Sequence, residues 1–364
     1  MAGINVEADD LRAYPQRLVE ILEPTPIEWL RIHPLPTRTL DQMGPGGLSY
    51  LDAVDYACGH GYNVIAPIDV GYSEVVGTIP LEGLDAFVAE SYDHSLKAAR
   101  QLSEVAQKNG VEMIYGVENE IDMKSWILQS LPGVAWRASP EAWAALALDY
   151  SLKYKRLNNI LRGIKDAVPD ARTMVNLSAE DLGDLLDVLR RHPDVLAKQG
   201  KTVEDVSDKL VDWRAEIGRL NGSLDVDMIG LDTYPNYVLK YPVLGQDTNS
   251  DLADAAQLGH KPVFNPEFGY STYRSWLDRV VFGLLRRRSA PGMQTEFFEN
   301  TLESIGLSQS LGTFPWVLVT HTDKPVSPKE EDFFGLFLMR GDQLRREPAF
   351  DYYIDWLRKV GAGR

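Results

Sequence analysis

The sequence predicts an α/β fold of the (β/α)₈ class, a TIM barrel, built as a single domain over residues 1–364. Short apolar runs rich in β-branched residues alternate with longer amphipathic stretches, as the strands and crossover helices of a parallel sheet do. Eight such cycles follow one another along the chain, which favours a closed barrel. The first run ends in VEADD, without the glycine-rich phosphate turn that is usual in an open doubly wound sheet.

The predicted strands are bounded by glycine, proline and polar residues. They cover residues 3–8, 28–34, 62–70, 111–120, 172–180, 226–234, 261–269 and 314–321. Predicted helices between and after them include 84–108, 141–168, 185–196, 210–220 and 350–360. Asn109-Gly110 ends the first of these helices as a C-terminal cap does, and two helical patterns between the fifth and sixth strands indicate an enlarged crossover.

Composition narrows the class of partner. The chain has 37 basic and 53 acidic residues and a net charge of −16, which disfavours nucleic acid and anionic membranes as partners. No run of eighteen apolar residues occurs, so no membrane insertion is expected. The single cysteine, Cys58, excludes a disulfide within the chain. Residues 1–6 lack a basic and then apolar run, so we expect a cytoplasmic chain, or a secreted one whose signal peptide is absent from this sequence.

In a (β/α)₈ barrel the active site is built at the carboxyl ends of the strands. Polar and aromatic residues at these predicted ends are Arg31, His33, Asp69, Glu118, Asn119, Glu120, Asn176, Glu180, Asp232, Tyr234, Asn265, Glu267, Trp316 and His321. Glu120 and Glu267 each close an otherwise apolar strand, which is a costly place for a charge without a use. Two carboxylates facing each other across a barrel mouth suit cleavage of a glycosidic bond, since one protonates the leaving oxygen while the other attacks the anomeric carbon or activates water.

Two short motifs resemble clan A (GH-A) of the retaining glycoside hydrolases. In that clan an Asn-Glu pair ends strand four and a glutamate ends strand seven, as Asn119-Glu120 and the PEFGYS run at 266–271 do here. The strand order fits as well, because two predicted strands lie between the motifs. The resemblance covers the barrel architecture, whereas each motif spans only a few residues. The strand-seven ending is similar to endo-β-mannanases and β-glucanases, without indicating one family.

The resemblance implies double displacement with retention, with Glu267 as nucleophile and Glu120 as acid/base. On a regular strand Glu118 shares a face with Glu120 and rivals it for the acid role, but Asn119 precedes Glu120 as the clan pattern requires. Retention would place the two carboxyl groups about 5–5.5 Å apart.

The same resemblance implies roles for further residues. Asn119 would donate to the sugar 2-hydroxyl, Arg31 would hold Glu267 ionised, and Tyr234 would touch the nucleophile. Trp316 would form the floor under the sugar at the cleavage site. His33, Asp69 and Asn176 are further candidate contacts to substrate. Aromatic residues at 126, 136, 237, 241, 270 and 273 follow the fourth, sixth and seventh strands and could stack on sugar rings.

The sequence thus predicts an O-glycosyl hydrolase acting on β-linked oligo- or polysaccharide, with carbohydrate as its partner and neither cofactor nor metal. An exo-acting β-glycosidase or a transglycosylase could use the same site, and a non-catalytic carbohydrate-binding barrel is an alternative of another class. A metal-dependent barrel hydrolase is a further alternative, although the six histidines are scattered and no HxH or HExxH occurs. The oligomeric state is left open.

Overall fold

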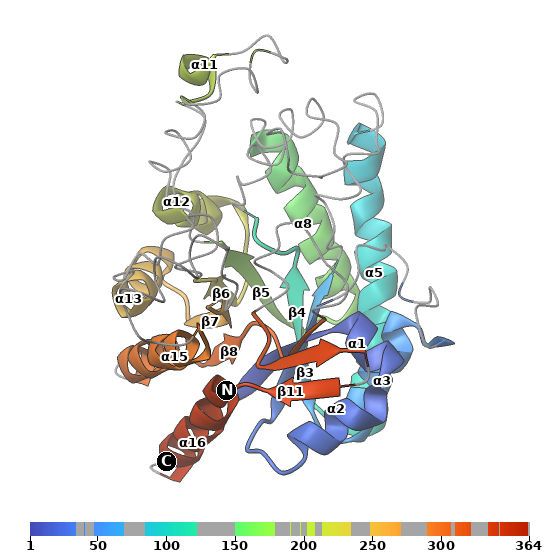
Figure 1. The fold of residues 1–364 in the computed structure, drawn as a ribbon. Helices are drawn as coiled ribbons and strands as arrows, with labels where there is room; N and C mark the ends of the chain where they lie inside the picture. The colour runs from blue at the N-terminus through green and yellow to red at the C-terminus, as the bar shows by residue number, and fades with distance from the viewer. Residues whose placement is uncertain are drawn as a thin grey trace.

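The computed structural model describes residues 1–33, 40, 47–68, 84–121, 150–178, 190, 197, 202–207, 213–233, 248–270, 290–306, 310–321, 334–341 and 343–362. Its main sheet has eight parallel strands in chain order (Figure 1). They are β1 (Gly3–Glu7), β2 (Trp29–His33), β3 (Asn63–Ile68), β4 (Met113–Val117), β5 (Arg172–Leu177), β6 (Met228–Leu231), β7 (Val263–Phe268) and β8 (Thr313–Pro315). Each of the first seven predicted strands coincides with one of these, and the observed bounds lie within the predicted ones.

Contacts between the first and last strands bring the sheet round into a barrel. Ala2 forms a parallel bridge with Thr313, and the Tyr353 hydroxyl donates to the carbonyl oxygens of Gly3 at 2.5 Å and Thr313 at 3.0 Å. The Phe314 ring fills the space beside Gly3, where a Cβ would lie 2.1 Å from it. The predicted (β/α)₈ barrel is therefore confirmed.

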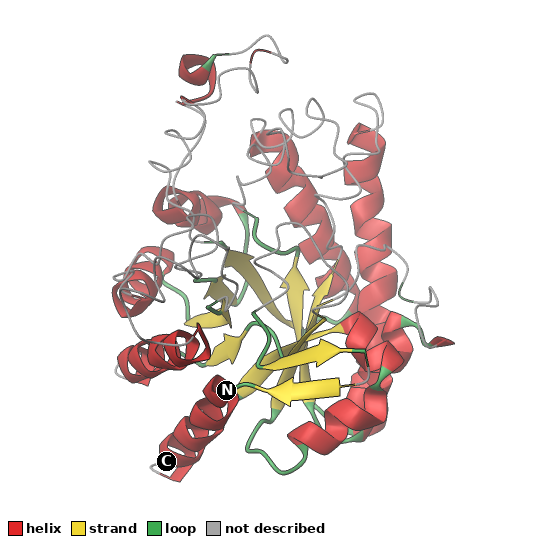
Figure 2. Ribbon diagram, in the orientation of Figure 1, coloured by secondary structure: helices red, strands yellow, loops and turns green. Residues whose placement is uncertain are grey.

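Helices surround the barrel on its outer side (Figure 2). They are α1 (Ala8–Ala13), α2 (Pro15–Leu22), α3 (Tyr50–Gly59), α5 (Leu84–Asn109), α8 (Tyr150–Ala167), α12 (Trp213–Ser223), α13 (Thr248–Gly259), α15 (Ala290–Gly306) and α16 (Pro348–Ala362). The short helix α11 (Val203–Ser207) lies away from the barrel (Figure 1). α5 ends at Asn109, followed by Gly110 with φ of 68°, as the predicted cap requires. None of the described helices is both long and apolar enough to cross a membrane.

One layer of apolar side chains fills the barrel interior below the site. Its members come from β2 to β8 in turn: Trp29, Ile65, Ile114, Met174, Met228, Phe264 and Phe314. Because side chains alternate along a strand, residues two and four positions further on also point into the barrel, nearer the carboxyl ends. Arg31, Asn176 and Asp232 stand at such positions and are fully buried. The apolar layer therefore forms a floor beneath a polar cluster.

The prediction of one strand over residues 314–321 is wrong. β8 ends at Pro315, and residues Val319–His321 form a separate strand, β9, in a three-stranded sheet with β10 (Phe337–Arg340) and β11 (Gln343–Arg346). Beyond Pro315, the Trp316 amide donates to the Phe268 carbonyl of β7 at 2.8 Å, and the Leu318 amide donates to the Asn5 carbonyl of β1 at 2.9 Å. The chain then leaves the barrel, and β9 pairs in parallel with β10 instead.

Candidate active site

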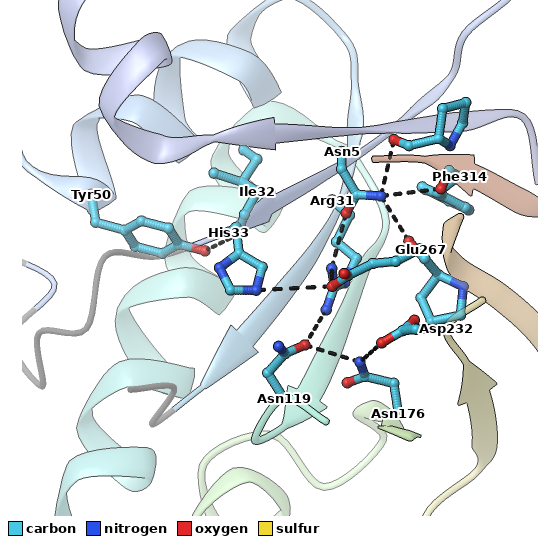
Figure 3. A network of polar contacts seen from close by, with 12 residues as sticks. Asn5, Arg31, Ile32, His33, Tyr50, Asn119, Asn176, Asp232, Glu267 and Phe314 are labelled. Atoms are coloured by element: carbon cyan, nitrogen blue, oxygen red, sulfur yellow. Dashed lines mark hydrogen bonds and ion pairs between the residues drawn. The ribbon is translucent and has the colours of Figure 1, made fainter. Parts of the chain in front are cut away.

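Arg31 lies at the centre of a polar network at the carboxyl ends of the strands (Figure 3). Its guanidinium forms an ion pair with Glu267, and Nη1 also donates to Asn5 Oδ1 at 2.9 Å. Nη2 donates to Asn119 Oδ1 at 2.6 Å. The planar fork of a guanidinium suits several acceptors at fixed angles better than a lysine ammonium does. Arg31 therefore joins residues of β1 and β7 and of the segment after β4.

Asn5 of β1 is a member of this network that the sequence did not single out. It is fully buried, and its Nδ2 lies 2.7–3.2 Å from the carbonyl oxygens of Pro266, Phe314 and Pro315, to which it donates. Asn5 therefore fixes Arg31 relative to β7 and β8. The available signal was a lone amide in the apolar run GINVE.

Glu267 enters the barrel through an irregularity in β7. Phe264 belongs to the interior floor, so regular alternation would turn Glu267 outward towards the helices. The pairing of β7 with β8 shifts register between Asn265 and Phe268, as it does at a β-bulge, and such a shift re-aims side chains. Glu267 is 4% exposed, with its Oε1 4.0 Å from His33 Nε2.

The segment after β4 leaves the strand conformation before it reaches Glu120. Glu118 and Glu120 have φ of 63° and 46°, a left-handed conformation uncommon for residues with a side chain. Glu118 turns to Arg156 of α8 and forms a buried ion pair with it. The Ile121 amide donates to the Asn176 carbonyl at 3.0 Å and holds the segment against β5.

This local geometry separates the two rival glutamates. Glu118 is held by the helix layer, whereas Glu120 is half-buried with a carboxylate oxygen within 4.8 Å of oxygens of Glu267 and Asp232. Asn119, between them, accepts hydrogen bonds from both Arg31 and Asn176.

Asp232, just past the end of β6, is a third carboxylate at this place. Its Oδ2 accepts from Asn176 Nδ2 at 2.5 Å, and its side chain is fully buried. Burial raises the pKa of Asp232 well above its usual value, and the charges of Glu267 and Glu120 raise it further, against the opposing effects of Arg31 and Asn176. Sequence reasoning noted Asp232 at a strand end but did not include it among the candidate site residues.

His33 and Trp316 stand together beside Glu267. Their rings meet edge to face with centroids 5.3 Å apart, and Trp316 is half-buried. The Trp316 amide donates to the Phe268 carbonyl at 2.8 Å. His321 belongs to β9 instead, where it lies 2.5 Å from Asp10 of α1.

Two of the predicted site residues, Asp69 and Tyr234, lie outside the described residues, as do Glu180 and the aromatic residues at 126, 136, 237, 241 and 273. Tyr270 is described and is buried, with its ring 5.5 Å from that of Phe297. It packs into the core beside α15.

Glu120, Asp232 and Glu267 form a set of carboxylates dense enough in oxygen to attract a cation. The positive charge at this place already comes from Arg31, which is bonded to Glu267. A divalent ion on Glu267 would have to compete with that guanidinium. The arrangement therefore favours chemistry performed by the carboxylates themselves.

Comparisons with known proteins agree with the barrel. No protein-family model and no curated protein sequence matches the chain. Among solved structures, a β-glucosidase from Thermotoga maritima in complex with deoxynojirimycin is 12% identical with a TM-score of 0.61, over 99% of this chain and 98% of that one. The GH53 catalytic domain from Ignisphaera aggregans is 16% identical with a TM-score of 0.55, over 96% of this chain and 94% of that one.

A β-glucuronidase from Faecalibacterium prausnitzii is similar over 98% of this chain, at 13% identity and a TM-score of 0.57. This chain spans 48% of that enzyme's length. At such identities the similarity shows the fold. The resemblance to clan A that the sequence predicted is confirmed in this sense, and the similar structures do not single out one family.

Proposed function

We propose that the chain is a retaining β-glycoside hydrolase in which Glu267 is the nucleophile and Glu120 the acid/base. The observation that carries this proposal is the close approach of the two carboxylates, whose oxygens lie within 4.8 Å, with Arg31 bonded to Glu267. Retaining glycosidases hold their carboxyl groups about 5–5.5 Å apart, whereas inverting enzymes leave about 6.5–9.5 Å for a water molecule. The separation in this site supports the retaining arrangement.

In the first step the Glu267 carboxylate attacks the anomeric carbon while Glu120 gives its proton to the leaving glycosidic oxygen. The C–O bond to the leaving group breaks, and a glycosyl ester of Glu267 forms. Arg31 offsets the negative charge of Glu267 before attack and bonds one of its oxygens, so a defined face of the carboxylate points to the substrate.

In the second step the Glu120 carboxylate takes a proton from water, and the hydroxide oxygen attacks the anomeric carbon. The ester breaks, Glu267 leaves as a carboxylate, and Glu120 is protonated again. Two inversions give net retention. The reaction consumes one water and needs no cofactor.

Asn119 is suited to contact the sugar beside the cleaved bond. Arg31 and Asn176 both donate to its Oδ1, which leaves the Nδ2 amide as the group that donates to a hydroxyl. Trp316 and His33 supply aromatic surface at the same place, and sugar rings stack on such surfaces through their C–H groups. We infer that the substrate is a β-linked oligo- or polysaccharide.

The test is a screen of aryl β-glycosides and β-linked polysaccharides, with NMR of the first-formed sugar. The β-anomer is expected first from a β-substrate, and a 2-deoxy-2-fluoro glycoside should leave a sugar on Glu267 that peptide mass spectrometry detects. Appearance of the α-anomer first would overturn the retaining assignment. Product analysis at high acceptor concentration separates hydrolysis from transglycosylation.

Variants separate the two roles. Glu120→Gln should lower kcat by about 10²–10⁴-fold on substrates with poor leaving groups and by much less on activated aryl glycosides, which leave without protonation. Glu267→Gln should abolish turnover on both. Glu112→Gln, at an exposed glutamate before β4, is the matched control and should leave activity unchanged. Full activity of Glu267→Gln would contradict the proposal, and ligand binding without any turnover would indicate a non-catalytic barrel.

A further inference from the structure

Asp232 has no part in a mechanism of two glutamates, yet one of its carboxylate oxygens lies within 4.8 Å of oxygens of both. Its amide donates to the Leu177 carbonyl at 2.8 Å, so the backbone at this point is fixed to β5. Its Oδ2 is bonded to Asn176, whereas Oδ1 is buried and has no hydrogen-bond partner within the described part of the chain. An ionised carboxylate oxygen without a donor would be costly in such a place.

The charges around Asp232 favour its neutral form. Glu267 of β7 and Glu120 after β4 have oxygens within 4.8 Å of Asp232, and Arg31 of β2 is the cation that acts on it. His33 of β2 is 4.0 Å from Glu267. With Glu267 ionised, Glu120 protonated and Asp232 neutral, the buried charge of Arg31 is balanced. A second carboxylate charge would exceed the single positive charge of Arg31.

Asp232 also reaches the substrate side of the site through two amides. Asn176 Nδ2 donates both to Asp232 Oδ2 and to Asn119 Oδ1, at 2.5 and 2.9 Å (Figure 3). Asn119 in turn accepts from Arg31, which holds Glu267. A shift of Asp232 would therefore move the side chains that orient both the sugar and the nucleophile.

We infer that Asp232 is a positioning residue that works in its protonated form, holding Asn176 and Asn119 in place beside the nucleophile. This inference rests on the proposed function for its effect on catalysis. Its claim about protonation does not, because burial and the neighbouring carboxylates exist whatever the reaction is. In this form the site holds a carboxylic acid that is neither general acid nor nucleophile.

The first test compares Asp232→Asn, a neutral side chain of the same shape, with Asp232→Ala. Asp232→Asn keeps an oxygen for Asn176 and should retain kcat within about tenfold of the parent, whereas Asp232→Ala should lose at least about 100-fold because Asn176 is no longer held. The alkaline limb of the pH profile of kcat/KM should lie at the same pH in Asp232→Asn as in the parent protein. If Asp232 were ionised, losing its charge would lower that limb by about one pH unit or more, which would overturn the inference.

The second test reads protonation without activity. Above pH of about 4 an unfolded aspartate ionises while Asp232 in the folded protein stays protonated, so folding loses stability as pH rises. From pH 5 to 7 the unfolding equilibrium constant of the parent should therefore rise about tenfold per pH unit relative to Asp232→Asn. Asp225→Asn, at an exposed aspartate before β6, is the matched control and should show no such trend. A constant ratio for Asp232→Asn would refute protonation.

The two tests separate the inference from the proposed function. If no glycoside is hydrolysed but the stability ratio grows with pH, the proposed function fails and the protonated state of Asp232 stands. If hydrolysis is found and the ratio is constant, the function stands and this inference fails. Chelator treatment of the parent should change neither readout, and a loss of activity reversed by a divalent metal would make Asp232 a ligand and overturn the inference.

Discussion

Replacement of Arg31 by methionine removes the guanidinium that is bonded to Glu267 while keeping a long side chain. Arg31 is 0% and Glu267 4% exposed, so water has little access to the carboxylate that is left behind. Breaking a buried ion pair by removing one partner costs about 3–5 kcal/mol. Asn5 and Asn119 each lose a donor as well, but these losses overlap with the first. We expect the free energy of unfolding to fall by about 3–5 kcal/mol.

Urea unfolding followed by circular dichroism at pH 7 measures this loss. A typical domain has about 5–15 kcal/mol of stability, so Arg31→Met should still fold at low temperature and allow the comparison. Arg358→Met is the matched control, because Arg358 is exposed, forms an ion pair with Asp355 and otherwise makes a long contact of 3.5 Å with the Pro24 carbonyl. Such exposed pairs contribute about 1 kcal/mol or less.

A double variant distinguishes the unpaired charge from lost packing. In Arg31→Met with Glu267→Gln no carboxylate is left without a cation, so the double variant should be more stable than the sum of the single effects predicts, by at least about 1 kcal/mol. A loss below about 1 kcal/mol for Arg31→Met, or strict additivity in the double variant, would refute the argument that Arg31 compensates a buried Glu267 charge.

Three further predictions concern other parts of the fold. Arg156→Met removes the cation paired with the buried Glu118 carboxylate, so it should lower the free energy of unfolding in urea by about 3–5 kcal/mol. It should also lower kcat more than it changes KM. An unaltered kcat would show that Glu118 does not position the next two residues. Tyr353→Phe removes the hydroxyl that bridges β1 and β8 and should cost about 0.5–1.5 kcal/mol in the same assay, with no loss if the barrel closes without it. Burial and the charge of Asp55 raise the pKa of Cys58 to about 12, so a thiol reagent at pH 8 should label the unfolded chain and not the folded one.

The barrel was predictable because two signals repeat along the chain. Alternating strand and helix patterns predict the number of cycles, and alternation within a strand predicts which residues face the interior. Trp29 and Arg31 illustrate the second signal, since one belongs to the floor and the other stands above it. The split of the last predicted strand was not predictable from periodicity, because its apolar pattern continues through Pro315 while its hydrogen-bonding partner changes from β7 to β10.

Local sequence patterns do not predict which side chains Asp232 lies close to. Its spacing from Met228 is enough to predict that it faces the barrel interior. Its distance from Glu120 depends on the tilt and register of strands that are not adjacent in the sheet, and no stretch of sequence encodes these. Asn5 is a similar case, because its bonds reach β7 and β8, more than 250 residues away along the chain.

Regular alternation fails at Glu267 itself and at Glu118 and Asn119, directly before Glu120. Counted from Ile114 of the floor, Glu118 should face the interior, yet it turns to Arg156 in the helix layer. Counted from Phe264, Glu267 should face outward, yet it lies at Arg31 in the barrel.

The residues next to Glu118 and Glu267 also face the side opposite to the one that regular alternation predicts. Phe268, which regular alternation would turn inward, packs with its ring 4.9 Å from that of Phe298 on α15. Asn119, which would face outward, accepts from Arg31 inside the barrel. Left-handed residues with a side chain cost about 1–3 kcal/mol each, so φ values of 63° at Glu118 and 46° at Glu120 persist only because the surrounding bonds hold them. Two independent strands thus break their pattern at the same level of the barrel, and each break brings one polar residue into contact with the guanidinium of Arg31. Such a coincidence is expected where the requirements of a functional site outweigh the regular conformation of a strand.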